Sequence, residues 1–176
     1  MKKLKIILCA TLLALLCSTT QAQALEVYGF GSYWNRQNLG DAGGGGIGIN
    51  IPVIIDPIRL DGRVYYFENG DFHNDKVDII PVDLGLQIHI IPKARLDPYA
   101  LGGISYNFVN SDKLDLDSGF GGYLGAGLNI RLDSSNMFSI FVEGLYRYSD
   151  INGDTDWGDL DASGFTANVG LKLSIF

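Results

Sequence analysis

Apolar and polar residues alternate with a period of two along most of this chain. The last stretch shows it most clearly, since residues 167, 169, 171, 173 and 175 are apolar and the residues between them are small or polar. Successive side chains point to opposite faces of a β-strand, so this period predicts strands with two unlike faces. The same pattern predicts eight strands: residues 26–34, 43–51, 58–67, 77–91, 99–108, 119–132, 138–148 and 163–176.

The connections between these strands alternate between short and long. The shorter ones cover residues 52–57, 92–98 and 133–136, and the longer ones cover residues 35–42, 68–76, 110–118 and 149–162. Short turns at one end and long loops at the other are typical of outer-membrane barrels, whose strands have about 9–11 residues. We therefore predict an all-β fold, an eight-stranded antiparallel up-and-down transmembrane β-barrel with both chain ends on the periplasmic side.

The two faces of the predicted strands differ in chemistry. Leu84 and Leu86, for example, alternate with Asp83 and Gln87. In a membrane barrel the apolar face is turned to lipid and the charged face to the lumen, the reverse of a soluble barrel. Eight strands leave just enough room for side chains to fill the lumen, and buried charges have to be paired. We expect a polar plug, with a narrow gated pore as the alternative, built from Arg59, Asp61, Arg63, Asp83, His89, Arg131, Glu143, Arg147 and Lys172.

Aromatic residues gather toward the ends of the predicted strands, and mid-strand positions are aliphatic or glycine. Amphipathic rings favour the two interfaces of a membrane, so two belts are expected. The belt next to the long loops would consist of Tyr33, Trp34, Tyr65, Tyr66, Phe67, Tyr106, Phe108, Phe120, Tyr146, Tyr148 and Phe165. The belt next to the short turns would consist of Tyr99, Phe138 and Phe176.

The amino terminus has the three parts of a secretory signal peptide. Three lysines precede an apolar core, residues 6–17, and Ala22-Gln23-Ala24 forms a small-x-small cleavage site. The core is shorter than the ~20 residues of a spanning helix. We predict cleavage after Ala24, or after Ala22, so that residues 1–24 are the signal peptide and residues 25–176 form the barrel domain. The expected location is the outer membrane of a Gram-negative-type bacterium.

Loss of the signal peptide changes the charge and the cysteine content. Three of the 13 basic residues leave, so ten remain against 20 acidic residues, a formal net charge of −10. This balance excludes a nucleic-acid binder. Cys9 and Cys17 leave as well, so the exported domain has no disulfide and depends on a core or a membrane for stability. A lipoprotein anchor at Cys17 is disfavoured because Leu16 stands where that signal has a small residue.

Several local features carry a resemblance to a known family. They are the signal peptide, residues 98–103, the glycine-rich sixth strand, Glu143 with residues 146–148, and the carboxyl-terminal strand. In these features the chain resembles the small eight-stranded outer-membrane proteins of the OmpA transmembrane-domain, OmpX and opacity-protein type. Such proteins end in a polar-x-Gly-x-x-apolar-x-apolar pattern that the barrel-insertion machinery recognises, and Asn168-x-Gly170-x-x-Leu173-x-Ile175 is similar to it. The resemblance implies that this machinery is a partner during assembly.

Two motifs invite a chemical interpretation that their surroundings disfavour. Residues 150–161 space acidic side chains like the ligands of a calcium loop, but Thr155 stands where the sharp turn needs glycine and no helices flank the loop. We favour a solvated acidic loop. Gly43-x-Gly45-x-x-Gly48 matches a dinucleotide-binding fingerprint, yet it opens a predicted strand rather than a helix.

The two histidines, His73 and His89, fall in no motif of acyl transfer. That chemistry requires a serine and a histidine oriented by a carboxylate. We therefore predict no catalytic, cofactor-binding or metal residues, and no enzyme.

The sequence favours a structural or surface-interaction role for a monomer. Its expected contacts are outer-membrane lipid, lipopolysaccharide and a partner of the acidic long loops, which could also hold cations that bridge to lipopolysaccharide phosphates. Passage of small solutes through a narrow pore is the first alternative, and a lipid-modifying enzyme is the second.

Overall fold

The computed structural model describes residues 25–37, 40–53, 57–72, 75–92, 94–111, 118–133, 137–151 and 160–175. The strands in these ranges are β1 (Leu25–Arg36), β2 (Gly40–Pro52), β3 (Ile58–Phe72), β4 (Asp75–His89), β5 (Leu96–Ser111), β6 (Gly119–Arg131), β7 (Phe138–Ile151), β8 (Leu160–Asp161) and β9 (Gly164–Ile175). In this part of the chain, no helix is long and apolar enough to cross a membrane.

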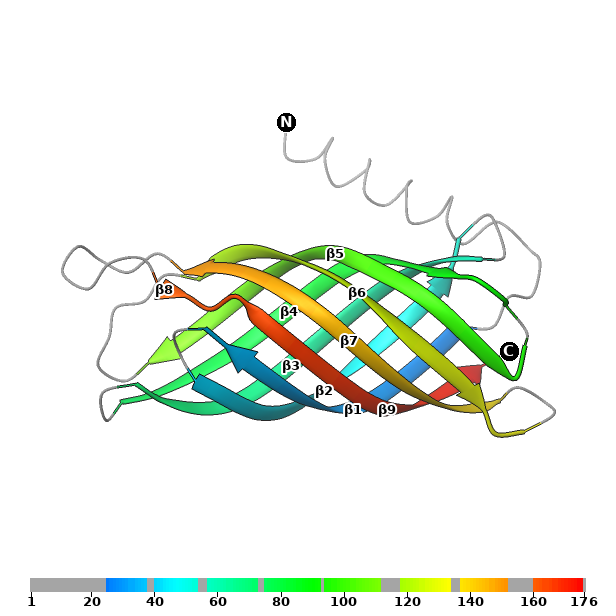
Figure 1. Ribbon diagram of the computed structural model, residues 1–176, viewed down its shortest axis with the longest axis horizontal. Helices are drawn as coiled ribbons and strands as arrows, with labels where there is room; N and C mark the ends of the chain where they lie inside the picture. Colours follow the sequence, from blue (N-terminus) through cyan, green and yellow to red (C-terminus); the bar gives the residue numbers. More distant parts are fainter. Residues whose placement is uncertain are drawn as a thin grey trace, which may run out of the picture.

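Eight of the strands form a closed antiparallel barrel in which strands wind obliquely around the long axis (Figure 1). Neighbours in sequence pair with each other from β1 to β7, β7 then pairs with β9, and β9 closes the ring against β1. The closing ladder runs from the pair Leu25 and Ile175 to the pair Arg36 and Gly164. The two-residue β8 pairs with the end of β7 in a separate short ladder. The predicted eight-stranded up-and-down barrel is confirmed.

The strands at the long-loop end extend further than the alternation predicts. Residues 68–72 and 75–76, expected to belong to a polar loop, instead continue β3 and β4 as a two-stranded ribbon up to the pair Phe72 and Asp75. The prediction of a loop is wrong because backbone hydrogen bonds continue a ladder whatever the polarity of the side chains. Beyond the apolar band of the barrel neither face of a strand has to be apolar. β5 and β7 likewise continue to Ser111 and Ile151.

The outer wall is apolar and the charged side chains lie on the inner wall, as the alternation predicts. Leu124 is 72% exposed and Ile47 is 70% exposed, whereas Arg63 and Glu143 are 2% and 6% exposed. A soluble barrel would bury the first pair and expose the second. The exposed aliphatic band therefore fits a hydrocarbon surrounding.

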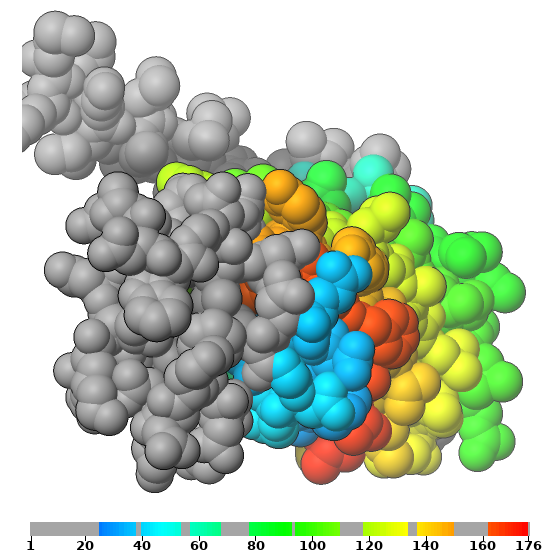
Figure 2. Space-filling view, turned by 60° about the vertical axis from the view of Figure 1, so that its left-hand side comes forward, coloured from blue at the N-terminus to red at the C-terminus, as the bar shows by residue number. Residues whose placement is uncertain are grey.

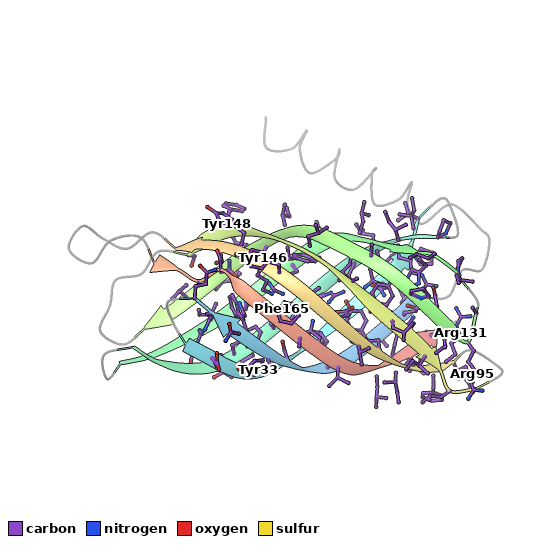
Figure 3. The ribbon with its side chains drawn as sticks, viewed as in Figure 1. Tyr33, Arg95, Arg131, Tyr146, Tyr148 and Phe165 are labelled. Carbon is purple, nitrogen blue, oxygen red and sulfur yellow. The ribbon has the colours of Figure 1, made fainter. Side chains whose placement is uncertain are left out.

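Exposed aromatic side chains form a belt on the outer wall toward the long-loop end. Figure 3 shows Tyr33, Tyr146, Tyr148 and Phe165 there, and Tyr146 pairs directly with Phe165 across β7 and β9. Further outward-facing rings are those of Tyr66, Phe108 and Phe120, with Tyr106 partly buried against the last two. At the short-turn end Phe138 is exposed, and Phe176 lies outside the described residues.

Other aromatic residues fill the lumen. The prediction that Trp34, Tyr65, Phe67 and Tyr99 belong to the belts is wrong, because all four are buried inside the barrel. Position along the strand placed them at an interface, but neighbouring residues of a strand point to opposite faces. The mid-strand inward positions are also aromatic rather than only aliphatic or glycine, since they include Tyr28, Phe30, Tyr123 and Phe141.

Inward glycines make room for these rings. A Cβ atom on Gly48 would lie 2.3 Å from Cζ of Tyr28, its partner across β1 and β2. A Cβ atom on Gly127 would lie 2.5 Å from Cζ of Tyr99, its partner across β5 and β6. The absent side chains let each ring lie flat on the neighbouring strand and bring its hydroxyl group into the lumen.

Candidate functional site: the ion-paired lumen

The middle of the lumen is crossed by an ion pair between Arg63 and Glu143. Nη1 of Arg63 donates to Oε2 at 2.5 Å and Nη2 donates to Oε1 at 3.1 Å, while Nε donates to Asp61 at 2.5 Å. Arg63 lies on β3 and Glu143 on β7, with three strands between them on either side of the ring. The pair therefore joins opposite walls. Its two parallel N–H···O bonds are the strong bidentate form of such a contact.

A second pair, between Arg147 of β7 and Asp83 of β4, also crosses the lumen. Nη1 and Nη2 of Arg147 donate to the two carboxylate oxygens at 3.1 and 2.6 Å. The guanidinium carbon lies 4.3 Å from the ring centre of Tyr65, close enough for a cation–π contact. We call Asp61, Arg63, Asp83, Glu143 and Arg147 the central cluster.

Neutral groups complete the bonding of the central carboxylates. Glu143 accepts from the Tyr99 hydroxyl at 2.6 Å and from Nδ2 of Asn168 at 3.1 Å, in addition to the two bonds from Arg63. Asp61 accepts from the hydroxyl of Tyr28 as well as from Arg63. Each carboxylate of the central cluster thus accepts at least two hydrogen bonds, the arrangement that buried charge requires.

The lumen toward the short turns holds a second group of charges. Glu26 pairs with Arg59 and, at 3.3 Å, with Lys172. Nδ1 of His89 lies 2.7 Å from Oδ2 of Asp97, and Nη2 of Arg131 lies 3.9 Å from the same oxygen. The His89 ring stacks on Tyr99 with a centroid distance of 5.1 Å. We call the six residues Glu26, Arg59, His89, Asp97, Arg131 and Lys172 the short-turn cluster.

The short-turn cluster is less completely bonded than the central cluster. Within the described residues, Nε2 of His89, Oδ1 of Asp97 and Nη1 of Arg131 are buried without a hydrogen-bond partner, as is Oδ1 of Asn129. Asp97 and Asn129 face each other across β5 and β6, and His89 faces Tyr99 across β4 and β5, so these atoms lie on three adjacent strands. Buried polar atoms without protein partners are normally bonded to ordered water.

All nine inward charged or histidine residues expected from the sequence lie in the lumen, and the expectation that they pair is confirmed. Sequence reasoning missed two further carboxylates, Glu26 and Asp97. Each could have been found from its parity, since Glu26 shares a face with Tyr28 and Asp97 shares one with Tyr99. With them, five carboxylates face the five basic side chains of the predicted set.

The motifs with possible chemistry form no complete site in the described part of the chain. Gly43, Gly45 and Gly48 lie in β2, not before a helix, as the sequence predicts. His73 and most of the acidic loop 150–161 lie outside the described residues. Elsewhere in the described ranges no three His, Cys, Asp or Glu side chains are placed to hold a metal ion. The free Nε2 of His89 has no hydroxyl partner there, so a serine–histidine pair is not formed.

Comparison with known proteins supports the fold independently. The model of a family described as "Outer membrane protein beta-barrel domain" matches residues 8–172. No curated protein sequence gives a significant match.

Solved structures of small outer-membrane barrels superpose on most of the chain. OprG from Pseudomonas aeruginosa gives a TM-score of 0.68 at 12% identity, covering 88% of this chain and 97% of that chain. Neisserial surface protein A gives 0.65 at 13% identity, covering 86% and 96%. The N-terminal barrel domain of OprF from Pseudomonas aeruginosa gives 0.54 at 20% identity, covering 86% and 97%. At identities this low, the superpositions show that the fold is shared.

The barrel closes on itself, its exposed wall is apolar, its charges are paired inside, and the family match extends over almost the whole described part of the chain. The protein belongs to the outer membrane protein beta-barrel domain family.

Proposed function

We propose that the protein is a structural barrel that seals its own lumen, supports the integrity of the outer membrane and contacts lipid, lipopolysaccharide and surface partners. The observation that carries this proposal is the pair of bidentate bridges across the lumen, from Arg63 to Glu143 and from Arg147 to Asp83. Because these bridges join distant strands, they occupy the cross-section through which a solute would have to pass.

The energy of the bridges favours a closed state. In a dry lumen a charge separated from its partner is left buried and uncompensated, which is unfavourable. An open pore would have to separate both bridges and also release the Tyr99 and Asn168 contacts to Glu143. A conducting state is therefore strongly disfavoured at equilibrium.

The outer wall supports the membrane role. The aromatic belt at the long-loop end, with Tyr33, Tyr66, Tyr146 and Tyr148 among its exposed rings, places hydroxyl groups where lipid headgroups would lie. We orient the long-loop end toward the outside and the short-turn end toward the periplasm, the usual arrangement of such barrels. The acidic long loops are then available to a surface partner or to cations shared with lipopolysaccharide phosphates.

Two measurements test the proposal together. Purified protein in planar lipid bilayers should give no steady current, and cells that lack the protein should become more sensitive to detergents and bulky antibiotics, with sensitivity restored to normal by the wild-type chain. Heat-modifiable migration on detergent gels serves as the control for folding. A steady ohmic current, or an unchanged envelope in the deletion strain, would contradict the sealing and the integrity parts respectively.

A narrow pore is the second candidate, and one observation favours it. Among the described residues, buried atoms of His89, Asp97, Asn129 and Arg131 lack a protein partner, and water entering the lumen from the short-turn end would satisfy them. If this water were continuous with the long-loop end, the conductance measurement would show small, salt-dependent currents. Glu143→Ala would then increase them, since it removes the anion that holds Arg63 across the lumen.

A further inference from the structure

An open apolar groove of about 510 Å³ lies on the outer wall where the two ends of the barrel sequence meet. Figure 2 shows this side of the molecule, with the blue residues of β1 and β2 beside the red residues of β9. The groove is lined mainly by Val27, Gly29, Ile47, Phe138, Leu171 and Leu173. It therefore crosses β2, β1, β9 and the start of β7.

The groove exists because the outward-facing residue of β1 between its two walls is a glycine. Gly29 pairs with Ile47 of β2 on one side and with Leu171 of β9 on the other. Those two side chains project strongly, since they are 70% and 64% exposed. The nearest atom to a Cβ placed on Gly29 would be a backbone oxygen 3.9 Å away, so no side chain of the described residues fills the space between the two walls.

The groove lies in the half of the apolar band nearer the short turns. Phe138, at the first position of β7, borders the end of the groove nearer the short turns. Next to Phe138 the rim carries Arg95. The backbone of Arg131 connects the two, because it pairs with Ser139, the neighbour of Phe138, and its N–H donates to the carbonyl oxygen of Arg95 at 2.9 Å. The Arg95 side chain is exposed, whereas the Arg131 side chain points into the lumen beside Asp97. Figure 3 shows both arginines at the same end of the barrel.

A thin, flexible apolar chain fits this surface better than a second barrel. A symmetric dimer through this face would place the groove of one protomer against the groove of the other, because a two-fold interface uses the same patch twice. Two facing hollows leave a void, and unfilled space in an interface loses dispersion contacts. In a membrane, lipid acyl chains surround the wall at this depth, and the exposed Arg95 at the rim adds a positive charge that complements an anionic headgroup.

We propose that this groove is a phospholipid site, which binds one acyl chain between Ile47 and Leu171 and holds an anionic headgroup phosphate at Arg95. The site goes beyond the proposed sealing function and does not depend on a closed lumen. In the orientation given above, the bound lipid belongs to the periplasmic leaflet.

The experiment counts retained lipid. The barrel is refolded in vesicles of phosphatidylethanolamine and phosphatidylglycerol, extracted in mild detergent and weighed by native mass spectrometry. The wild type should retain one phospholipid, enriched in phosphatidylglycerol. Gly29→Leu should fill the groove and reduce retention several-fold. Gly31→Leu is the matched control, because Gly31 lies on the same face of the same strand, has open space beside it and does not line the groove.

Further arms separate the chain from the headgroup. Arg95→Gln should abolish the enrichment in phosphatidylglycerol while one lipid is still retained. Leu171→Ala, which lowers one wall without adding bulk, should weaken retention even if Gly29→Leu fails the heat-modifiable folding control. Equal retention by Gly29→Leu and Gly31→Leu overturns the proposal. So does a lipid-free wild-type dimer that Gly29→Leu converts to a monomer, since a second copy would then cover the groove.

Discussion

The central cluster and the short-turn cluster occupy one lumen and both combine acidic with basic side chains, but they differ in how fully these side chains are bonded. In the centre, Glu143 accepts four hydrogen bonds from Arg63, Tyr99 and Asn168. At the short-turn end, Asp97 has one oxygen bonded to His89, and the other has no partner among the described residues. The difference indicates that the centre holds the walls together, while the end tolerates water and contributes less to stability.

The largest effect is expected from Glu143→Ala. Removing this carboxylate leaves Arg63 buried with Asp61 as its one anion among the described residues, so the free energy of unfolding should fall by about 3–5 kcal/mol. The measurement is the urea midpoint of the refolded barrel in lipid vesicles, followed by heat-modifiable migration. The double variant R63M/E143L should recover much of the loss, because it removes both charges. A loss below about 1 kcal/mol would place this bridge with weak surface pairs.

A smaller loss is expected when a ring of the centre is displaced without touching a charge. Gly48→Val puts side-chain atoms where the Tyr28 ring lies and so disturbs the bond from Tyr28 to Asp61. Overpacking of this kind destabilises by about 1–3 kcal/mol in the same urea assay. Gly62→Val is the control, since a Cβ there meets only Ile49 at an ordinary 3.6 Å. Equal losses in both variants would show that glycine flexibility, rather than room for the ring, matters.

Arg147→Lys keeps the charge of the central cluster but removes the planar fork. A lysine can neither bond both oxygens of Asp83 in parallel nor stack as a plane over Tyr65. The expected loss in the urea assay is about 1–2 kcal/mol, the range of a desolvated cation–π contact. Arg95→Lys, an exposed change at the rim, should alter stability by no more than about 0.5 kcal/mol. Equal losses of stability from Arg147→Lys and Arg95→Lys would show that the planar fork of Arg147 contributes nothing to stability.

The smallest effect is expected in the short-turn cluster. His89→Gln removes a bond to Asp97 that water can replace, so the loss should be about 0.5–1 kcal/mol. The same urea assay compares it with Glu143→Ala. A loss as large as that of Glu143→Ala would remove the distinction between the two clusters, because His89 would then be as indispensable as a central residue.

The sequence predicts the wall better than it predicts the lumen. A period of two assigns Leu84 and Leu86 outward and Asp83 inward with no knowledge of neighbours, and the structure agrees. The same pattern does not predict which charges pair, because the contact between Arg63 and Glu143 depends on the number of strands in the barrel and on their stagger. The alternation along a single strand gives neither the number of strands nor their stagger.

The errors have equally physical causes. Tyr65 and Tyr66 are adjacent in sequence at one membrane depth, yet one is buried in the lumen and the other is 46% exposed. The position of Tyr65 along its strand led to the wrong prediction, whereas the alternation of the two strand faces assigns its side chain correctly to the lumen. Asp97 was missed because it lies between turn-forming residues, although β5 already begins at Leu96.

The seam between β1 and β9 joins the first described residue, Leu25, to the last, Ile175. Contacts this remote in sequence form late and slowly, because most of the chain's freedom must be lost before they are made. Until β9 docks, the sheet is an open ribbon and both ends of the bridge from Arg63 to Glu143 remain hydrated. Dehydration of the lumen is therefore tied to the final step of assembly, so that a barrel lacking its last strand could hold neither its shape nor its charges in lipid.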